Sequence, residues 1–235
     1  MKIRRFSGAL VLAVLLCLPG YSDERFETSA NFFSGFPQRE FKQNVKRAGI
    51  GGSGYFAYKF KNSPFSAGAS LGILVYGSET RAEFLAASIP EVEVNVTTRN
   101  YILMCHLVFR VQPLEGDFRP YAEGLAGFHH LWTETGIYDR GYCHERIASS
   151  VNLSDFAWSF GAGCGVMIKV FEHRKNGNRN LFAMFIDLGA RFLKGGRAEY
   201  LHEGSICQKN EQLIYDVKMS DTDLVTARLG LSFVF

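Results

Sequence analysis

After its first 22 residues, the sequence has no apolar run long enough for a transmembrane helix. Such a helix needs roughly 20 consecutive apolar residues, and the one clear run, Ala9 to Leu18, has ten. The mean hydropathy of −0.02 likewise shows that polar and apolar residues are mixed along the chain. These absences exclude a helical membrane protein. A membrane-spanning chain of this hydropathy must use strands, in which only alternate residues need to be apolar.

An excess of charge of one sign is also missing. The whole chain has 26 basic and 23 acidic residues, a net charge of +3. Three of the basic residues, Lys2, Arg4 and Arg5, precede the apolar run, and the first 22 residues contain no acidic residue. The rest of the chain is therefore close to neutral, and its charge gives no support for a nucleic-acid partner.

Residues 1–22 have the pattern of a cleaved signal peptide. The basic start and the apolar run are followed by small residues at Gly20 and Ser22, which predicts cleavage after Ser22. Cys17 would suit a lipoprotein, but the bulky Leu16 before it does not. We expect an exported protein whose residues 23–235 form one domain.

What the chain does contain is alternation, most clearly in its last eight residues, Arg228 to Phe235. A strand places successive side chains on opposite faces, so one face here is large and apolar and the other is small or polar. Seven earlier segments alternate in the same way. We predict eight strands, near residues 25–34, 48–60, 65–77, 96–111, 119–132, 156–171, 181–194 and 222–235.

The connections between these segments alternate in length. Residues 61–64, 112–118 and 172–180 are short connections, and residues 35–47, 78–95, 133–155 and 195–221 are long ones. A membrane barrel with both termini in the periplasm should have three short inner turns and four longer outer loops. The rhythm of the sequence therefore predicts an eight-stranded antiparallel up-and-down barrel.

The predicted faces have the polarity of a membrane barrel, because the outer face is apolar and the inner face contains polar and charged residues. A water-soluble barrel would show the reverse. The outward rows of three strands are Phe182, Met184, Ile186, Leu188, Ala190 and Phe192; Tyr101, Leu103, Cys105, Leu107 and Phe109; and Trp158, Phe160, Ala162, Cys164, Val166 and Ile168.

Aromatic residues gather at the strand ends, as is typical of the two interfaces of a membrane. The predicted periplasmic belt contains Tyr58, Phe60, Phe65, Phe109, Phe118, Phe171, Phe182, Phe233 and Phe235. The predicted outer belt contains Tyr76, Tyr101, Trp132, Phe156, Trp158 and Phe192.

With these features, the sequence resembles the small bacterial outer-membrane β-barrel family, the eight-stranded barrels of the OmpA/OmpX type. The resemblance covers the whole mature chain and includes the segment Arg119 to Phe128. It implies that Arg228, Gly230, Phe233 and Phe235 form the terminal assembly signal. It also implies a location in the bacterial outer membrane and, as partners, outer-membrane lipids, periplasmic chaperones and the barrel-assembly machinery.

Eight strands leave an interior that side chains just fill, and charges inside it must be paired or hydrated. We predict that Arg110 lies near Glu123 and that Asp187 lies near Arg228, as parts of a structural plug. A gate or narrow ion path is the alternative. The predicted interior charges are Glu27, Lys59, Arg110, Glu123, Lys169, Asp187, Arg191 and Arg228.

Cysteines are few, and four remain after cleavage. Cys143 and Cys207 fall in long outer connections, where a disulfide can persist in an oxidising compartment. Cys105 and Cys164 are expected to be thiols that face lipid. His144 and His202 would allow a Cys/His metal site, but the spacing fits no known zinc pattern. We expect no metal and no cofactor.

Two patterns suggest enzymes. Gly49 to Gly54 and Gly161 to Gly165 look like phosphate-binding glycines, but no helix pattern follows either one. His129 and His130 precede Thr133, Glu134 and Thr135, a composition that an acyl-transfer site would need.

Some barrels of the family modify lipid A, so an enzyme of this kind is the alternative function. Our main expectation is a non-enzymatic barrel with a structural or surface-binding role, or a narrow channel, whose long outer loops bind an unidentified ligand.

Overall fold

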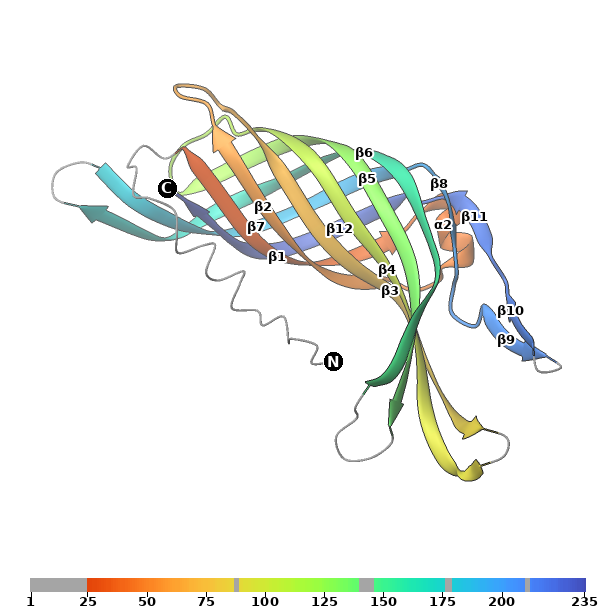
Figure 1. The fold of residues 1–235 in the computed structure, drawn as a ribbon. Helices are drawn as coiled ribbons and strands as arrows, with labels where there is room; N and C mark the ends of the chain where they lie inside the picture. Colours follow the sequence, from red (N-terminus) through yellow and green to blue (C-terminus); the bar gives the residue numbers. More distant parts are fainter. Residues whose placement is uncertain (1–24, 87–88, 140–145, 176–178, 210–211) are drawn as a thin grey trace.

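The computed structural model describes residues 25–86, 89–139, 146–175, 179–209 and 212–235 (Figure 1). Eight long strands close into an antiparallel barrel in the order β1-β12-β7-β6-β5-β4-β3-β2. This confirms the predicted fold class. The strands are β1 (Phe26–Pro37), β2 (Gly49–Lys59), β3 (Phe65–Ala86), β4 (Ile89–Val111), β5 (Phe118–Asp139), β6 (Arg146–Lys175), β7 (Arg179–Gly195) and β12 (Leu224–Val234).

The first and last strands close the barrel. Their pairing runs from Glu27 opposite Val234 to Pro37 opposite Leu224. At its end, the N–H of Phe26 donates to the carbonyl of Phe235 at 3.1 Å, and the N–H of Phe235 donates to the carbonyl of Phe26 at 2.9 Å. Closure leaves no open edge in the barrel wall, which a strand-built membrane protein requires.

The exterior of the barrel is apolar, as the alternation predicted. Phe32 is 80% exposed, Trp158 is 73% exposed and Leu107 is 72% exposed, whereas Phe185 on the inner face is fully buried. Exposed apolar side chains around a closed ring of strands form the kind of surface that contacts lipid in membrane barrels. Among the described residues, no helix is long and apolar enough to cross a membrane.

The aromatic side chains of each predicted belt contact one another across neighbouring strands. In the periplasmic belt, Phe65 stacks on Phe109 with ring centroids 5.4 Å apart. In the outer belt, Tyr101 stacks on Trp132 at 4.9 Å. One predicted member is wrong: Tyr76 is buried and faces inward. A bulge between Val75 and Gly77 shifts the register at this point.

Two of the predicted loops are strands instead. The described residues of the segments 78–95 and 133–155 extend the β3–β4 and β5–β6 hairpins beyond the barrel wall (Figure 1). We call this four-stranded extension the arm; it comprises residues 76–86, 89–100, 133–139 and 146–154. These segments are rich in charged and hydroxyl residues, and for this reason the sequence predicted loops there. Cross-strand pairing in water does not require an apolar outer row.

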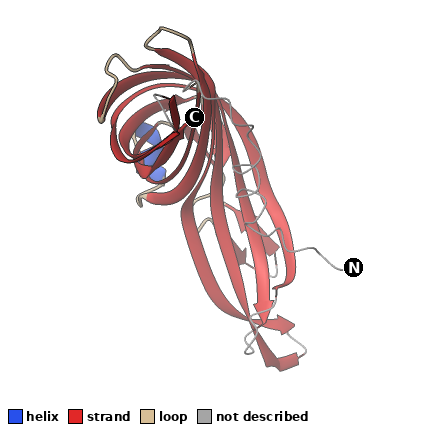
Figure 2. Ribbon diagram, turned by 90° about the vertical axis from the view of Figure 1, so that its left-hand side faces the viewer, coloured by secondary structure: helices blue, strands red, loops and turns tan. Residues whose placement is uncertain are grey.

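The other two long connections fold over one mouth of the barrel. One contains the short helix α2 (Arg39–Asn44). The other contains β8 (Arg197–Tyr200), β9 (Ile206–Lys209), β10 (Gln212–Tyr215) and β11 (Lys218–Asp221). Seen along the barrel, α2 lies within the outline of the strand ring (Figure 2). We refer to α2, β8 and β11 as the cap.

Candidate functional site

Arg110 is at the centre of the interior charges. Its side chain is fully buried, and its Nη1 atom pairs with a carboxylate oxygen of Glu27. Its Nε and Nη2 atoms donate to Oε2 of Glu123 at 3.3 and 3.0 Å. The guanidinium carbon also lies over two aromatic rings, 4.3 Å from the centroid of Tyr55 and 4.0 Å from that of Tyr121. Hydrogen bonds and cation–π contacts together compensate for the loss of water around this charge.

Glu123 is shared by three arginines. Besides Arg110, it accepts a hydrogen bond from Nε of Arg191 at 2.6 Å and pairs with Nη2 of Arg228 at 2.9 Å. These side chains come from β4, β5, β7 and β12, so the single carboxylate connects strands from opposite parts of the barrel. A second guanidinium contact, from Nη1 of Arg191 to Oγ of Ser70 at 3.1 Å, reaches β3.

Asp187 and Arg228 meet through a third residue that we had not assigned to the interior cluster. The hydroxyl of Tyr121 donates to Oδ1 of Asp187 at 2.5 Å and accepts from Nη2 of Arg228 at 2.7 Å. Gly165 and Gly189 leave room for this ring, because a Cβ at either position would collide with the hydroxyl of Tyr121. Tyr121 has the same parity as the inward Glu123, and this alternation is the signal that could have placed Tyr121 inside.

Lys59 and Lys169 do not join this cluster. Lys59 pairs with Glu115 at 3.1 Å, and Lys169 pairs with Asp117 at 2.7 Å and with Glu172 at 3.1 Å. Both lysines lie near the short turns, where their long side chains reach carboxylates at the barrel end rather than the centre. The hydrogen bond from Lys59 lowers the pKa of Glu115, which lies in the turn outside the barrel wall.

The interior is closely filled around these charges. The charges of this cluster balance, because it has three acidic and three basic side chains, and all six are buried. The acidic residues are Glu27, Glu123 and Asp187, and the basic residues are Arg110, Arg191 and Arg228. The cavity that Arg191, Arg228 and His106 help to line has a volume of about 20 Å³. Such a space holds about one water molecule.

The residues of the acyl-transfer hypothesis are not brought together. His129 is fully buried inside the barrel, with its Nδ1 atom 3.5 Å from Oγ1 of Thr222. His130 points outward and stacks on Phe156, with ring centroids 4.2 Å apart. Thr133 donates inward to Asn100, while Glu134 accepts from Arg146. Successive residues of a strand face opposite sides, so a cluster in sequence becomes two separated groups.

The glycine-rich segments and cysteines also have structural positions. Gly49 to Gly54 lie in β2 and Gly161 to Gly165 lie in β6, and neither precedes a helix. Cys105 and Cys164 are free thiols.

Cys143 and the side chain of Cys207 lie outside the described residues, so their disulfide stays a prediction; His144 lies there too. In the part of the chain that the structure describes, no group of three or more His, Cys, Asp or Glu residues could hold a metal ion.

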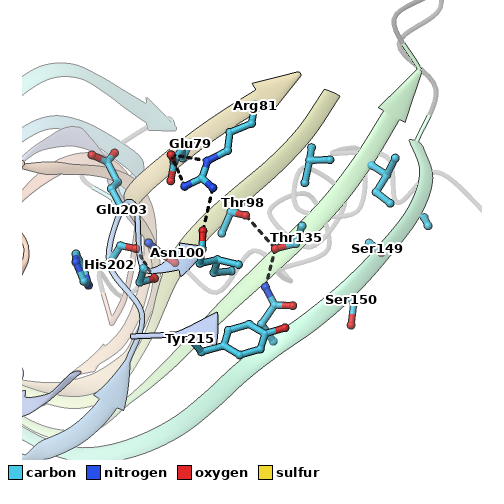
Figure 3. A pocket seen from close by; sticks show the side chains of 16 residues that line it. Glu79, Arg81, Thr98, Asn100, Thr135, Ser149, Ser150, His202, Glu203 and Tyr215 are labelled. Atoms are coloured by element: carbon cyan, nitrogen blue, oxygen red, sulfur yellow. Dashed lines mark hydrogen bonds and ion pairs between the residues drawn. The ribbon is translucent and has the colours of Figure 1, made fainter. Parts of the chain in front are cut away.

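An outer pocket with a volume of about 410 Å³ lies between the arm and the last long connection (Figure 3). Its wall includes a row of hydrogen-bonded side chains on three strands. The hydroxyls of Thr98 and Thr135 are 3.0 Å apart, and Nδ2 of Asn152 donates to Oγ1 of Thr135 at 2.6 Å. Val96, Ile137 and Ala148 add apolar surface.

Charged residues line the opposite side of the outer pocket. Nε of Arg81 donates to Glu79 at 2.8 Å, and Nη1 of Arg81 donates to the carbonyl of Ile206 at 2.9 Å. His202, Glu203 and Tyr215 from the last connection complete this side. The sequence predicted ligand binding by long outer loops. It did not predict this pocket, because the pocket is lined by segments that were expected to be loops and are strands. Apolar patches beside convergent polar groups are typical of ligand-binding sites.

The sequence matches no protein-family model and no curated protein. Among solved structures, the chain is similar to Neisserial surface protein A (9% identity, TM-score 0.40, 89% of this chain and 96% of that chain covered). It is similar to a major outer membrane protein from Thermus thermophilus (11%, TM-score 0.42, 89% and 99% covered).

A third similar structure is that of Ail, the attachment invasion locus protein of Yersinia pestis, in complex with the heparin analogue sucrose octasulfate (14%, TM-score 0.36, 90% and 99% covered). These likenesses concern the fold alone.

Proposed function

We propose that this chain is an integral protein of the bacterial outer membrane, in which a sealed barrel anchors an arm that binds an extracellular ligand. The location is supported by the closed strand ring, the exposed apolar exterior and the two aromatic belts. Outer-membrane lipids are then its immediate partners. Export by the signal peptide in residues 1–22, and delivery by periplasmic chaperones to the assembly machinery, complete this proposal.

The orientation follows from the two ends of the barrel. The C-terminus lies at the end opposite the arm (Figure 1). In barrels of this kind the short turns face the periplasm and the long connections face outward. Both termini of the barrel are therefore periplasmic, and the arm, the cap and the outer pocket are extracellular.

The observation that carries the binding role is the contrast between the two cavities. The interior space beside Arg191 and Arg228 has room for about one water molecule, whereas the outer pocket measures about 410 Å³. A barrel whose centre is filled by six buried charges gives solutes no path. A structural plug is therefore favoured over a gate, and binding at the surface is favoured over transport. Catalysis is disfavoured because His129 and Glu134 are on different faces of β5 and have different partners.

A binding screen with a pocket variant tests this proposal. Purified protein in detergent micelles is applied to an array of saccharides and to a displayed peptide library, together with a Ser150→Trp variant whose large ring fills the outer pocket. We expect ligands that bind the natural protein and bind the variant at least about tenfold more weakly, the loss of one or two contacts.

Ser78→Trp is the control, because Ser78 lies on β3 in the arm but does not line the outer pocket. If every ligand binds both tryptophan variants as well as it binds the natural protein, the outer pocket is not the binding site.

A further inference from the structure

The wall of the outer pocket contains two rows of residues that cross the four strands of the arm. The members of each row lie opposite one another from strand to strand, between the register shifts of these hairpins. The polar row is Glu79, Thr98, Thr135 and Ser150; the apolar row, which begins at an arginine, is Arg81, Val96, Ile137 and Ala148. Alternate residues of a strand share a face, so the two rows run side by side about 7 Å apart.

The polar row keeps part of its hydrogen-bonding capacity for a ligand. Thr98 and Thr135 share one hydrogen bond between their hydroxyls, and Asn152 uses one amide N–H on Thr135. Each hydroxyl has one donor and two acceptor sites, and the amide of Asn152 also has an oxygen that accepts. Within the described ranges, the hydroxyls of Ser150 and Tyr215 have no hydrogen-bond partner in the chain. Donors and acceptors therefore lie together along one line of the pocket wall.

The charged side chains of the outer pocket are matched within the chain. Nε and Nη2 of Arg81 both lie 2.8 Å from Oε1 of Glu79, and its Nη1 donates to the carbonyl of Ile206 at 2.9 Å. The carboxylate of Glu203 pairs with Arg47 at 3.6 Å. A cationic or anionic ligand would have to break these contacts, because a charge that leaves water needs a partner of opposite sign. An uncharged ligand can bind without disturbing them.

Apolar surface lies beside the polar row. Val96 and Ile137 contribute it from the arm, and the ring of Tyr215 contributes it from the last connection (Figure 3). Tyr215 is 42% exposed, so its ring is available to a ligand. A tyrosine side chain combines a large apolar ring with a polar edge. The lining is therefore suited to a ligand that has hydroxyl groups along its edges and an apolar face.

We propose that the outer pocket binds an uncharged saccharide, whose hydroxyl groups contact the polar row while the C–H face of a sugar ring packs on Tyr215. This inference rests on the proposed surface-binding function and names the chemical class of its ligand. The volume of about 410 Å³ lies within the range of about 300–1,000 Å³ that is typical of small-molecule sites.

A peptide fits this surface less well. The central strands β4 and β5 are paired with neighbours on both sides along the two rows. Their N–H and C=O groups are used in that pairing, so the pocket wall offers side-chain hydroxyls and amides in place of main-chain groups. Saccharides satisfy such groups with their own hydroxyls, each of which both donates and accepts.

The test applies the purified protein, in a detergent without a sugar headgroup, to an array of saccharides. The array contains glucose, galactose, mannose, N-acetylglucosamine and their disaccharides, each also in a sulfated form. It further contains neutral glycans of animal cell surfaces and oligosaccharides released from bacterial lipopolysaccharide, which distinguish the two sources of such a ligand. We expect at least one uncharged saccharide to bind, and its sulfated form to bind at least about tenfold more weakly. Binding of no uncharged saccharide, or equal or tighter binding of the sulfated form, would overturn the proposal.

A matched pair of variants places the saccharide on the polar row. Thr98→Val/Thr135→Val removes two hydroxyls and nearly keeps the side-chain shape, so the bound saccharide should be held at least about tenfold more weakly. Thr80→Val is the control, because Thr80 forms a similar hydroxyl pair with Thr97 at 3.0 Å in the arm but does not line the outer pocket. Heat-modifiable gel migration checks that the variants are folded. Equal binding by both variants would refute the polar row as the contact.

A second pair of variants examines the aromatic contact. Tyr215→Ala removes the ring and should weaken the saccharide at least about tenfold, whereas Tyr215→Phe keeps the ring and should retain most of the affinity. Equal affinity of Tyr215→Ala and the natural protein would refute the packing of a sugar ring on this residue.

The remaining outcomes separate this inference from the proposed function. If the only ligands whose binding is lost in Ser150→Trp are peptides or acidic saccharides, the outer pocket is a binding site but not one for uncharged saccharides. That result would refute this inference and leave surface binding in place. If no ligand is weakened by Ser150→Trp, both the proposed function of the pocket and this inference are refuted.

Discussion

At the scale of single residues, Glu123 determines the arrangement of the barrel interior. It pairs with Arg110, Arg191 and Arg228, so three buried cations share this carboxylate. Arg228 and Gly230, which the resemblance assigned to the assembly signal, also have roles in the folded barrel. Arg228 belongs to this cluster, and a Cβ at Gly230 would collide with the backbone of Ala30 and Asn31.

Replacing Glu123 by glutamine should therefore destabilise the barrel strongly. Breaking a buried ion pair from one side costs about 3–5 kcal/mol, because the partners keep their charge without compensation. Glu115→Gln is the matched control, since Glu115 is 79% exposed and water screens its pair with Lys59; its effect should stay within about 1 kcal/mol.

Urea unfolding in detergent micelles, followed by the loss of heat-modifiable migration, measures both free energies of unfolding. Similar values for the two variants would contradict the central role of Glu123.

At the scale of elements, the cap depends on one aromatic side chain of its short helix. Phe41 is fully buried, and its ring lies 5.7 Å from that of Tyr76 and 5.0 Å from that of Tyr200. Asn44 donates to the hydroxyl of Tyr200 at 2.8 Å, and this hydroxyl lies 2.7 Å from Oγ of Ser220. A helix of six residues has little stability of its own, so these contacts hold it.

Phe41→Ala should release the cap while the barrel stays closed. Removing a buried phenylalanine ring costs about 3–5 kcal/mol, which exceeds what the remaining contacts of so short a helix supply. Limited trypsin digestion should then cut faster after the exposed Lys42, Lys46 or Arg47.

Glu40→Ala, an exposed change in the same helix, should leave the rate unchanged. An unaltered cleavage pattern in Phe41→Ala would show that the cap does not depend on this ring.

At the scale of the whole molecule, an apolar wall surrounds an interior that buried charged side chains fill. Eight strands give a barrel that side chains just fill. Three acidic and three basic residues occupy its centre, and the cap covers one mouth. The arm extends the β3–β4 and β5–β6 hairpins beyond this barrel.

The purified protein should therefore give no discrete conductance steps in planar bilayers. Ions would have to displace the contacts of Arg110, Glu123 and Arg228, which fill the centre. An open barrel porin inserted under the same conditions shows that the measurement detects a channel. Regular unitary steps from the natural protein that change in Arg110→Ser would contradict the sealed interior.

Much of the barrel could be predicted because alternation is a local property of a strand. The outward row from Phe182 to Phe192 and the inward Asp187 follow from parity alone, and the structure agrees with both. The extended hairpins could not be recognised from that pattern, because strands in water need no apolar row. Tyr76 was misplaced because a bulge, which parity does not reveal, moves it inward.

The sequence by itself determined the number of barrel strands, which side chains face inward or outward, and that strands adjacent in sequence pair with one another. These features depend on periodicity and on short connections. Only the tertiary structure decided which charges meet. Glu123 collects arginines from three strands, and Tyr121 connects Asp187 to Arg228, since contacts across a barrel depend on its curvature and stagger. The same holds for the outer pocket, which exists because some strands continue where their neighbours end.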